Sequence, residues 1–275
     1  MVDPTPRQVY AILLDEDPYL CSIRTMYRLL AALQAVGERR NQRPHVVHAR
    51  PELETSAPNQ LWSWDITKLK TSVKWTYIDL CVVLDVCSRY VVGWLISTKE
   101  NAALARELVE QSALRQEVPA GQLTLHADRG AAMRSKSLAE KLTDLRIEPS
   151  FSRPRQSNDI PFSEALFKTI KYAPACPDRF ESMDHARAVM TPFFEHYNEH
   201  HRHTGIGLMT PAAVHRGDAP TITAARHLTL GAAFERNPLR FKGLRPSPPT
   251  IPETVYITRG STRSRSPVPT AIKAH

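Results

Sequence analysis

Three carboxylates in this sequence have the residue types and the spacing that a pair of divalent metal ions requires. Asp65 follows a run with two tryptophans, Asp128 follows a short apolar run, and Glu164 lies in a segment with helical periodicity. Mg²⁺ prefers oxygen ligands and typically takes one or two carboxylates together with substrate phosphates. Two strand-end aspartates and one helix-borne glutamate therefore predict a site for two Mg²⁺ ions, with Mn²⁺ as a substitute. Such a pair clamps the attacking and the leaving oxygen of a phosphodiester exchange.

Each acid has an expected role in that site. Asp65 would bridge both ions, while Asp128 and Glu164 would each complete one coordination sphere. Metal-bound water or a DNA 3′-hydroxyl would then be the nucleophile, so the chemistry needs no histidine base. A chain with 28 acidic residues contains many such triads by chance, and the segments around the three acids must therefore carry the argument.

The segments around the first two aspartates predict a mixed sheet. Two apolar runs, 77–84 and 90–96, are separated by turn-forming residues and predict an antiparallel hairpin that follows a strand beginning near Trp62. After the hairpin, strand and helix patterns alternate. A hairpin followed by strand–helix alternation is typical of a mixed five-stranded sheet flanked by helices, the order of a ribonuclease-H-like α/β core. The later elements are expected at 100–116 (helix), 123–126 (strand), 135–145 (helix) and 147–151 (strand).

The third acid lies on an expected helix at 161–172, and a further helix is expected at 182–199. Pro161 fits the first turn, and Glu164, Lys168 and Lys171 fall on one face. The two lysines are expected to hold DNA phosphates near the metals, or else to form an ordinary solvated face. Arg129, directly after Asp128, is expected either to orient that carboxylate or to contact a phosphate.

The first 37 residues predict two short helices, at 5–15 and 22–36, with Ser22 as the N-cap of the second. A helix-turn-helix-like DNA reader fits this pattern, and a simple helical hairpin with a basic edge is the alternative. Its expected DNA-binding residues are Arg24, Arg28, Arg39 and Arg40. The remaining chain is expected to divide into a basic, proline-containing linker (38–59), a catalytic core (60–217), a C-terminal extension (218–257) and a basic disordered tail (258–275).

The composition agrees with a DNA partner. Lys and Arg number 36 against 28 Asp and Glu, and the sequence pI is near 9.5. Neutralising phosphates releases counterions and favours binding to nucleic acid. The four cysteines show no zinc spacing, and reduced thiols are expected. No signal segment or membrane-length apolar run is evident, so we expect a cytoplasmic, nucleoid-associated protein.

Two other groups compete for a functional role. His196 and His200 are four residues apart, beside His201 and His203, yet no third ligand in a metalloprotease context accompanies them, and local packing or a DNA-facing surface is favoured over zinc. Asp85 follows an apolar strand and could compete for the metal site. It lies in the expected hairpin turn, where capping the turn is the favoured role.

Several motifs, taken together, resemble the integrase-type catalytic core of bacterial insertion-sequence transposases, from about residue 5 to about residue 217. The similarity is greatest to the OrfB product of elements whose full transposase is an OrfA–OrfB fusion. The resemblance implies an Asp-Asp-Glu triad at Asp65, Asp128 and Glu164 on a ribonuclease-H-like fold. It also implies element terminal repeats and target DNA as substrates, a homo-oligomer on DNA and an OrfA-type partner. The motifs are Trp64-Asp65-Ile66-Thr67, Ser88-Arg89-Tyr90, Gly93-Trp94, His126-Ala127-Asp128-Arg129-Gly130, Phe151-Ser152-Arg153-Pro154, Ser163-Glu164-Ala165-Leu166-Phe167-Lys168, Tyr197-Asn198-Glu199-His200-His201-Arg202 and Thr210-Pro211.

The sequence also departs from that family. Ile160 stands where the family usually has asparagine, four residues before Glu164, and we expect it to project beside the active-site face. Ala131 stands where serine is common, and the chain is expected to lack an initial helix of the helix-turn-helix region. These departures leave open a catalytically decayed or repurposed DNA-binding protein. A third alternative, a nuclease acting on RNA–DNA hybrids, is disfavoured by the N-terminal helices and the basic linker.

Overall fold

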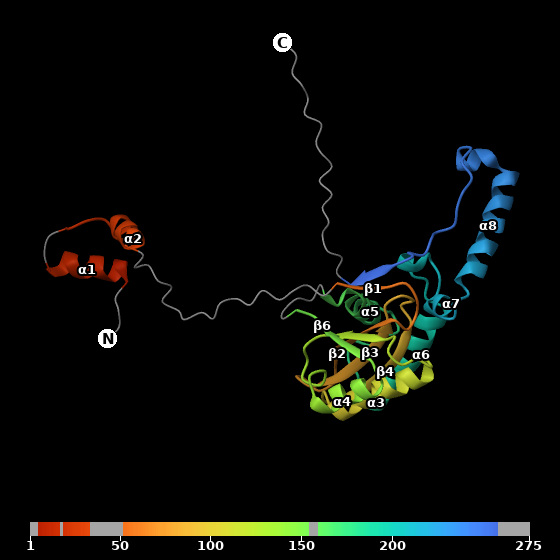
Figure 1. The fold of residues 1–275 in the computed structure, drawn as a ribbon, viewed down its shortest axis with the longest axis horizontal. Coiled ribbons are helices and arrows are strands. Elements are labelled where there is room, and N and C mark those ends of the chain that lie inside the picture. Colours follow the sequence, from red (N-terminus) through yellow and green to blue (C-terminus); the bar gives the residue numbers. More distant parts are fainter. Residues whose placement is uncertain (1–4, 17–18, 34–51, 154–158, 258–275) are drawn as a thin grey trace, which may run out of the picture. The chain divides into compact units, whose positions relative to one another are not determined.

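The computed structural model describes residues 5–16, 19–33, 52–153 and 159–257 (Figure 1). The chain is divided into two compact units, Met1–His48 and Ala49–His275. The predicted residues Arg39 and Arg40 and the predicted disordered tail lie outside the described residues. None of the described helices is long and apolar enough to cross a membrane.

The first unit contains helices α1 (Pro6–Glu16) and α2 (Ile23–Ala32). Ser22 caps α2, because its side chain accepts a hydrogen bond from the Thr25 backbone N–H at 3.2 Å. Arg24 and Arg28 are exposed on α2, which buries none of its side chains. The two predicted helices are therefore present, and α2 leaves its basic residues free to meet solvent or a partner.

The second unit is built on a five-stranded sheet with the order β4-β3-β2-β5-β6. Short turns join the first three strands, which pair antiparallel, whereas helical crossovers make β5 and β6 parallel to β2. This is the predicted ribonuclease-H-like mixed sheet. The strands are β2 (Leu61–Lys70), β3 (Tyr77–Asp85), β4 (Val91–Ser97), β5 (Thr124–Ala127) and β6 (Glu148–Phe151).

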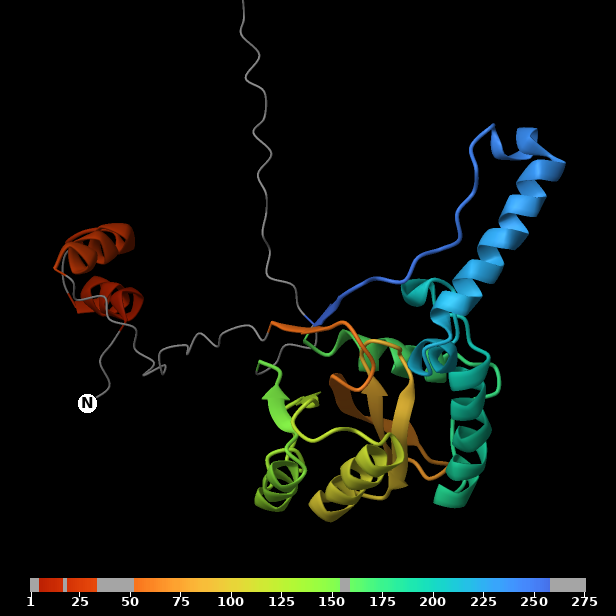
Figure 2. The same cartoon turned by 45° about the vertical axis from the view of Figure 1, so that its right-hand side comes forward.

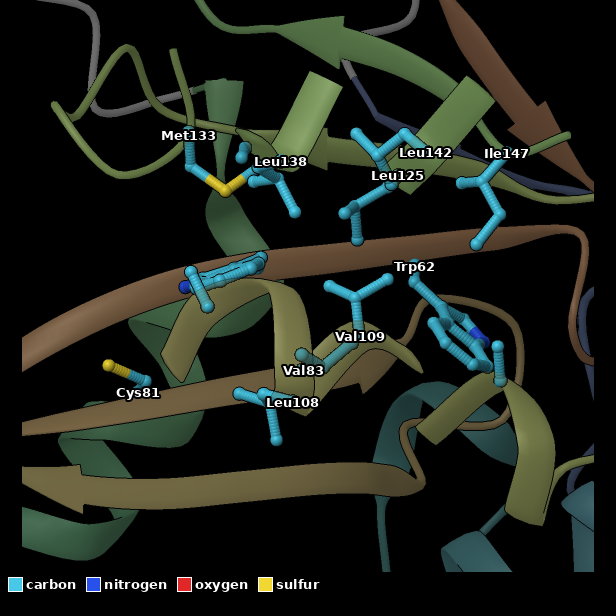
Figure 3. Packing of buried hydrophobic residues seen from close by; sticks show 14 of the residues in the cluster. Trp62, Cys81, Val83, Leu108, Val109, Leu125, Met133, Leu138, Leu142 and Ile147 are labelled. Atoms are coloured by element: carbon cyan, nitrogen blue, oxygen red, sulfur yellow. The ribbon is translucent and has the colours of Figure 1, made fainter. Parts of the chain in front are cut away.

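Helices cover both faces of the sheet. On one face, α3 (Ala102–Arg115) and α4 (Lys136–Asp144) pack on Trp62, Val83 and Leu125, as Figure 3 shows. On the other, α5 (Pro161–Lys171) and α6 (Met183–Glu199) pack on alternate strand residues such as Leu80 and Val82. Because successive strand residues point to opposite faces, a strand buried on both faces is apolar on both, which explains the apolar run from Leu80 to Leu84 in β3.

The chain beyond α6 carries elements that the sequence did not predict. The helices are η2 (Thr204–Ile206), α7 (Pro211–His215), α8 (Ala219–Arg236) and η3 (Pro238–Phe241), and the last strand is β7 (Val255–Ile257). Strand β7 pairs antiparallel with β1 (Leu53–Thr55), so the C-terminal extension returns to the start of the unit. The four cysteines are free thiols, as predicted.

Gly93 on β4 is where the sheet approaches α3 most closely. A Cβ at this position would collide with Ser112 Oγ and would lie 3.0 Å from Leu108 Cδ1. We expect Gly93→Ala to lower the free energy of unfolding by about 1–3 kcal/mol through overpacking. Ser112→Ala should recover part of that loss, measured by denaturant unfolding.

Gly231 on α8 provides the matched control, since a Cβ there would meet nothing within 4 Å. Gly231→Ala should leave the free energy of unfolding unchanged or raise it, because alanine is the better helix former. Equal losses in both variants would contradict the packing explanation.

Candidate active site

Strand pairing places the first two acids next to each other. In the parallel register of β2 and β5, Trp64 is opposite Ala127. Asp65 and Asp128 are the residues that follow, Asp65 within β2 and Asp128 directly after the end of β5. Since Trp64 packs in the cluster under α3 and α4, the alternation of a strand turns Asp65 to the opposite face, which α5 covers.

Asp65 is not at a strand end, contrary to the prediction. The pairing of β2 with β5 stops at Trp64, but its pairing with β3 continues from Asp65, opposite Val82, to Lys70. Asp65 is therefore held in the middle of a long strand at the point where one of its two neighbours ends. Asp128 follows the last residue of β5 directly, as predicted.

The helix that carries Glu164 is fixed to the strand that carries Asp65. Ser63 Oγ and Ser163 Oγ, one hundred residues apart in sequence, form a buried hydrogen bond of 2.8 Å. Ser163 directly precedes Glu164, and Ser63 lies on the same face of β2 as Asp65. This contact brings the third acid to the side of the sheet that holds the first.

The rest of α5 follows the predicted amphipathic pattern. Leu166 and Ile170 are buried against the sheet, while Lys168 and Lys171 are exposed. Glu164 lies in the first turn of the helix, half-buried. A carboxylate there is favoured by the helix dipole.

The three carboxylates act on one another electrostatically. The pKa of Asp65 is raised to about 7, mainly by burial and to a smaller extent by the negative charges of Asp128 and Glu164. A hydrogen bond from the Ile66 backbone N–H and the positive charge of Lys171 act in the opposite direction. A cation among these three groups would offset the repulsion.

The carboxylates are not gathered into a closed set of ligands. In the described part of the chain, no three His, Cys, Asp or Glu side chains lie close enough together to hold a metal ion. Asp65 Oδ1 accepts from Ile66 N at 2.8 Å, and Asp128 Oδ1 accepts from Gly130 N at 2.9 Å. The donor set is nevertheless three carboxylates from separate elements, which fits a hard cation such as Mg²⁺ that keeps several water ligands.

A buried polar network precedes α5, and it was not predicted from the sequence. The guanidinium of Arg153 donates to both oxygens of Asp159, each at 3.0 Å, and this pairing holds the pKa of Asp159 below its ordinary value. Burial lowers the pKa of His126, so the ring is neutral; its Nε2–H donates to the Asp159 carbonyl at 3.0 Å. The motif residues His126 and Arg153 therefore anchor the chain that enters the glutamate helix.

Ile160 lies at the entry to α5. Its side chain is buried, with 5% of its surface exposed, and its position beside the active-site face stays a prediction. Ile160 is the N-cap residue of α5, with φ −128° and ψ 52°. Because these angles are not helical, counting back four residues from Glu164 along a helix does not give its direction.

Arg89 also supports the glutamate helix, a role that was not predicted from the sequence. It lies in the turn between β3 and β4 with a φ of 67°, and its guanidinium stacks on the Phe162 ring at 3.9 Å. Phe162 is in the first turn of α5, two residues before Glu164. The hairpin turn thereby supports the start of the glutamate helix.

The competing candidates have structural roles. Asp85 accepts hydrogen bonds from the backbone N–H and the hydroxyl of Ser88, both at 2.7 Å, which confirms that it caps the hairpin turn. Tyr197 and His203 are joined by a 2.8 Å hydrogen bond, and the His201 ring stacks on Tyr197. Arg129 donates its Nε–H to the Ser152 carbonyl at 3.1 Å, joining the ends of β5 and β6.

Two family profiles, both described as integrase core domain, match residues 55–157 and 145–211. Among curated proteins, the chain is 32% identical over 157 residues to the transposase InsF for insertion sequence IS3A of Escherichia coli (strain K12), covering 57% of this chain and 54% of that protein. It is 30% identical over 169 residues to the transposase for insertion sequence element IS904 of Lactococcus lactis subsp. lactis (strain IL1403), covering 59% of this chain and 66% of that protein. The chain thus spans about half the length of the first relatives it matches.

A solved structure with a similar fold is the HTLV-2 integrase catalytic core domain in complex with magnesium. It is 20% identical, with a TM-score of 0.44, over 58% of this chain and 97% of that one.

The buried serine pair can be tested by a double-mutant cycle. Ser63→Ala or Ser163→Ala alone leaves a buried hydroxyl without its partner and should cost about 1–3 kcal/mol of unfolding free energy. The double variant should cost less than the sum of the two, because no hydroxyl is then left unpaired. Denaturant unfolding of all four proteins gives the coupling energy.

A second double-mutant cycle serves as the control. It pairs Ser63 with Ser112, a buried serine on the opposite face of the sheet, in place of Ser163. Ser63→Ala and Ser112→Ala should be additive. Additivity in the Ser63–Ser163 cycle as well would show that the contact does not couple α5 to β2.

Proposed function

Since this chain belongs to the bacterial insertion-sequence transposases that carry an integrase core domain, we propose that it catalyses DNA strand cleavage and strand transfer. Asp65, Asp128 and Glu164 are the proposed catalytic residues. The observation that carries the proposal is the strand register that makes Asp65 and Asp128 neighbours on the face where the Ser63–Ser163 contact holds the glutamate helix.

The three carboxylates are proposed to hold two Mg²⁺ ions, for which Mn²⁺ can substitute. Bound there, the ions would activate a water or a 3′-hydroxyl and stabilise the leaving oxygen of the phosphodiester. The protein's own contribution is positional. Asp65 is immobilised in the central strand, Asp128 at the end of its neighbour, and Glu164 on a helix supported by Ser163, by Arg89 on Phe162, and by the Arg153–Asp159 pair.

The proposed DNA-binding residues surround this site or lie in the N-terminal unit. Lys168 and Lys171 are exposed on the helix of Glu164 and would hold phosphates of the DNA end. Arg129, directly after Asp128, would either orient that carboxylate or contact a phosphate. In the N-terminal unit, the exposed Arg24 and Arg28 of α2 are proposed to contact DNA, together with Arg39 and Arg40.

The domain assignment follows the same division. We propose residues 60–217 as the catalytic core and 1–37 as a helix-turn-helix-like DNA-binding segment. Of the predicted linker 38–59, β1 (Leu53–Thr55) belongs to the second unit, so the proposed linker ends before it. The substrates would be the terminal repeats of an element and a target DNA. Because two DNA ends must be joined in one event, a homo-oligomer on DNA is proposed, and an OrfA-type protein is a proposed further partner.

The alternative is a catalytically decayed or repurposed DNA-binding protein. It rests in part on the loss of an amide that would touch DNA or the metal ligands, and Ile160, buried at the entry to α5, cannot supply that amide.

The catalytic assignment predicts the effect of Asp128→Asn. Strand transfer from pre-cleaved DNA ends, assayed with Mg²⁺ or Mn²⁺, should fall below detection, while DNA affinity stays the same or improves as a negative charge is lost. Mn²⁺ should also raise the thermal unfolding temperature of the parent protein and not that of the variant.

Asp144→Asn is the matched control, because Asp144 is an exposed acid at the end of α4, on the other face of the sheet. It should retain both the activity and the Mn²⁺ response. Undiminished strand transfer by Asp128→Asn would refute the triad.

The two exposed lysines of α5 predict a salt-dependent binding defect. Lys168→Ala combined with Lys171→Ala should weaken DNA binding and make the slope of log K against log salt shallower by about one unit per lost contact. Fluorescence anisotropy over a salt series measures the slope.

Arg106→Ala combined with Lys136→Ala removes the same charge from α3 and α4 and should leave the slope nearly unchanged. If the slopes of the two variants agree, the α5 lysines are a solvated surface.

A further inference from the structure

The C-terminal extension forms an arm that projects from the body of the second unit, as Figure 2 shows. Helix α8 runs for 18 residues and buries none of its side chains. At 1.5 Å per residue it is about 27 Å long. After η3 at the far end, the chain returns to β7, which pairs with β1. We define residues 219–245 as the arm and residues 235–245 as its tip.

Contacts within the arm hold it in a defined shape. At its base, Arg226 donates to the carbonyls of Gly207 and Leu208, at 2.6 and 2.8 Å. At the tip, the Phe234 and Phe241 rings pack 6.0 Å apart, and Asn237 caps η3. Because the chain is tied to the body at both ends of the extension, the arm can present its tip at a set distance.

The tip is strongly basic. Its four cations are all exposed, and Glu235 is the only acid between residues 219 and 250. Arg245 pairs with Glu235 at 2.5 Å, whereas no carboxylate partner for the other three cations is found among the described residues. These three cations are Arg236, Arg240 and Lys242.

These three cations lie close together along the chain, at the end of α8, in η3 and in the turn that follows η3. Lys242 and Gly243 both adopt left-handed backbone angles, with φ of 52° and 77°, where the chain reverses after η3. Three cations within seven residues, on a short helix end and a tight turn, form a compact positive surface. Residues 219–234 of α8, between the base and the tip, contain no acid to compensate them.

We propose that the arm tip is a second DNA-contacting surface, which holds phosphates away from the catalytic carboxylates. The inference rests on the proposed function, since that function supplies the DNA. Charge complementarity identifies the partner: exposed guanidinium groups without carboxylates are suited to phosphates, and arginine forms paired hydrogen bonds with them. An arm of about 27 Å is comparable to one turn of B-DNA, roughly 34 Å, so its tip can reach a flank about a turn from its base.

An alternative occupant is a second copy of the chain. Leu239 and Leu244 at the tip are 88% and 75% exposed and would suit an apolar contact between subunits. The cations favour DNA, because a copy of this chain, with a net charge of +8, would repel them. The experiment must separate the two occupants.

The test uses the full chain with Arg236→Gln, Arg240→Gln and Lys242→Gln combined, and a duplex that exceeds the footprint of the core. We expect affinity to fall roughly tenfold or more, with the salt slope shallower by about 0.9 for each lost contact. Circular dichroism checks that the fold is retained. The matched control, Arg106→Gln with Lys136→Gln and Arg146→Gln, removes the same charge from exposed positions on or near α3 and α4.

Binding by the tip variant that matches the control in affinity and slope would overturn the proposal. A change of oligomeric state by light scattering, with an unchanged slope, would overturn it in favour of a subunit contact. Leu239→Ser with Leu244→Ser sharpens this distinction, since it should alter assembly only in that second case.

The outcome is independent of catalysis. Asp128→Asn should bind DNA with the same salt slope as the parent protein. If the parent protein shows no strand transfer, the proposed function is refuted. The arm test still holds in that case, because it measures DNA binding alone. Loss of binding in the tip variant, with normal strand transfer at saturating DNA, would support the arm as a holding surface.

Discussion

The structure depends on placing a charged carboxylate in the central strand of a sheet that is covered on both faces. Strand β2 has a neighbouring strand on each side, and helices cover both faces of the sheet. An ionised group there loses solvation, and this is the main reason that the pKa of Asp65 rises to about 7. The fold accommodates Asp65 by ending the β5 pairing at Trp64 and by opening the sheet at that point.

Polar contacts around the start of α5 follow from the same constraint. A wholly apolar helix interface would seal Asp65 from the ions and phosphates that it is proposed to meet. Instead, α5 packs through Leu166 and Ile170 along its length but begins with the Ser63–Ser163 hydrogen bond. Buried hydroxyls that satisfy each other fix the position of a helix without adding a charge. The helix is thus held firmly at the end that carries Glu164.

Local sequence patterns predicted most of the sheet and its helices. Contacts between residues far apart in the sequence could not be predicted in this way. The alternation of apolar runs and turn residues was enough for the sheet, the helices and the strand that delivers Asp128. The Ser63–Ser163 bond joins residues one hundred positions apart, and neither serine has a distinctive context, so no periodicity could reveal it. Periodicity does not give the exact start of α5, so it could not show that Ile160 is the N-cap residue. Helix α8 was missed because a helix that buries no side chain needs no amphipathic pattern.

The distribution of charge separates two requirements that oppose each other. A metal site needs clustered carboxylates, whereas DNA binding needs cations, and cations packed against the carboxylates would compete with the metal ions for them. The positive charge of Lys171 lowers the pKa of Asp65, but its effect is smaller than that of either Asp128 or Glu164. The other candidate phosphate contacts lie on the outer face of α5, on α2 and at the arm tip. A polyanion bound at several such places can be held strongly without any one cation entering the carboxylate site. The chain can therefore combine a net charge of +8 with a negative site, because most of its candidate DNA contacts lie on helix surfaces and at the arm tip.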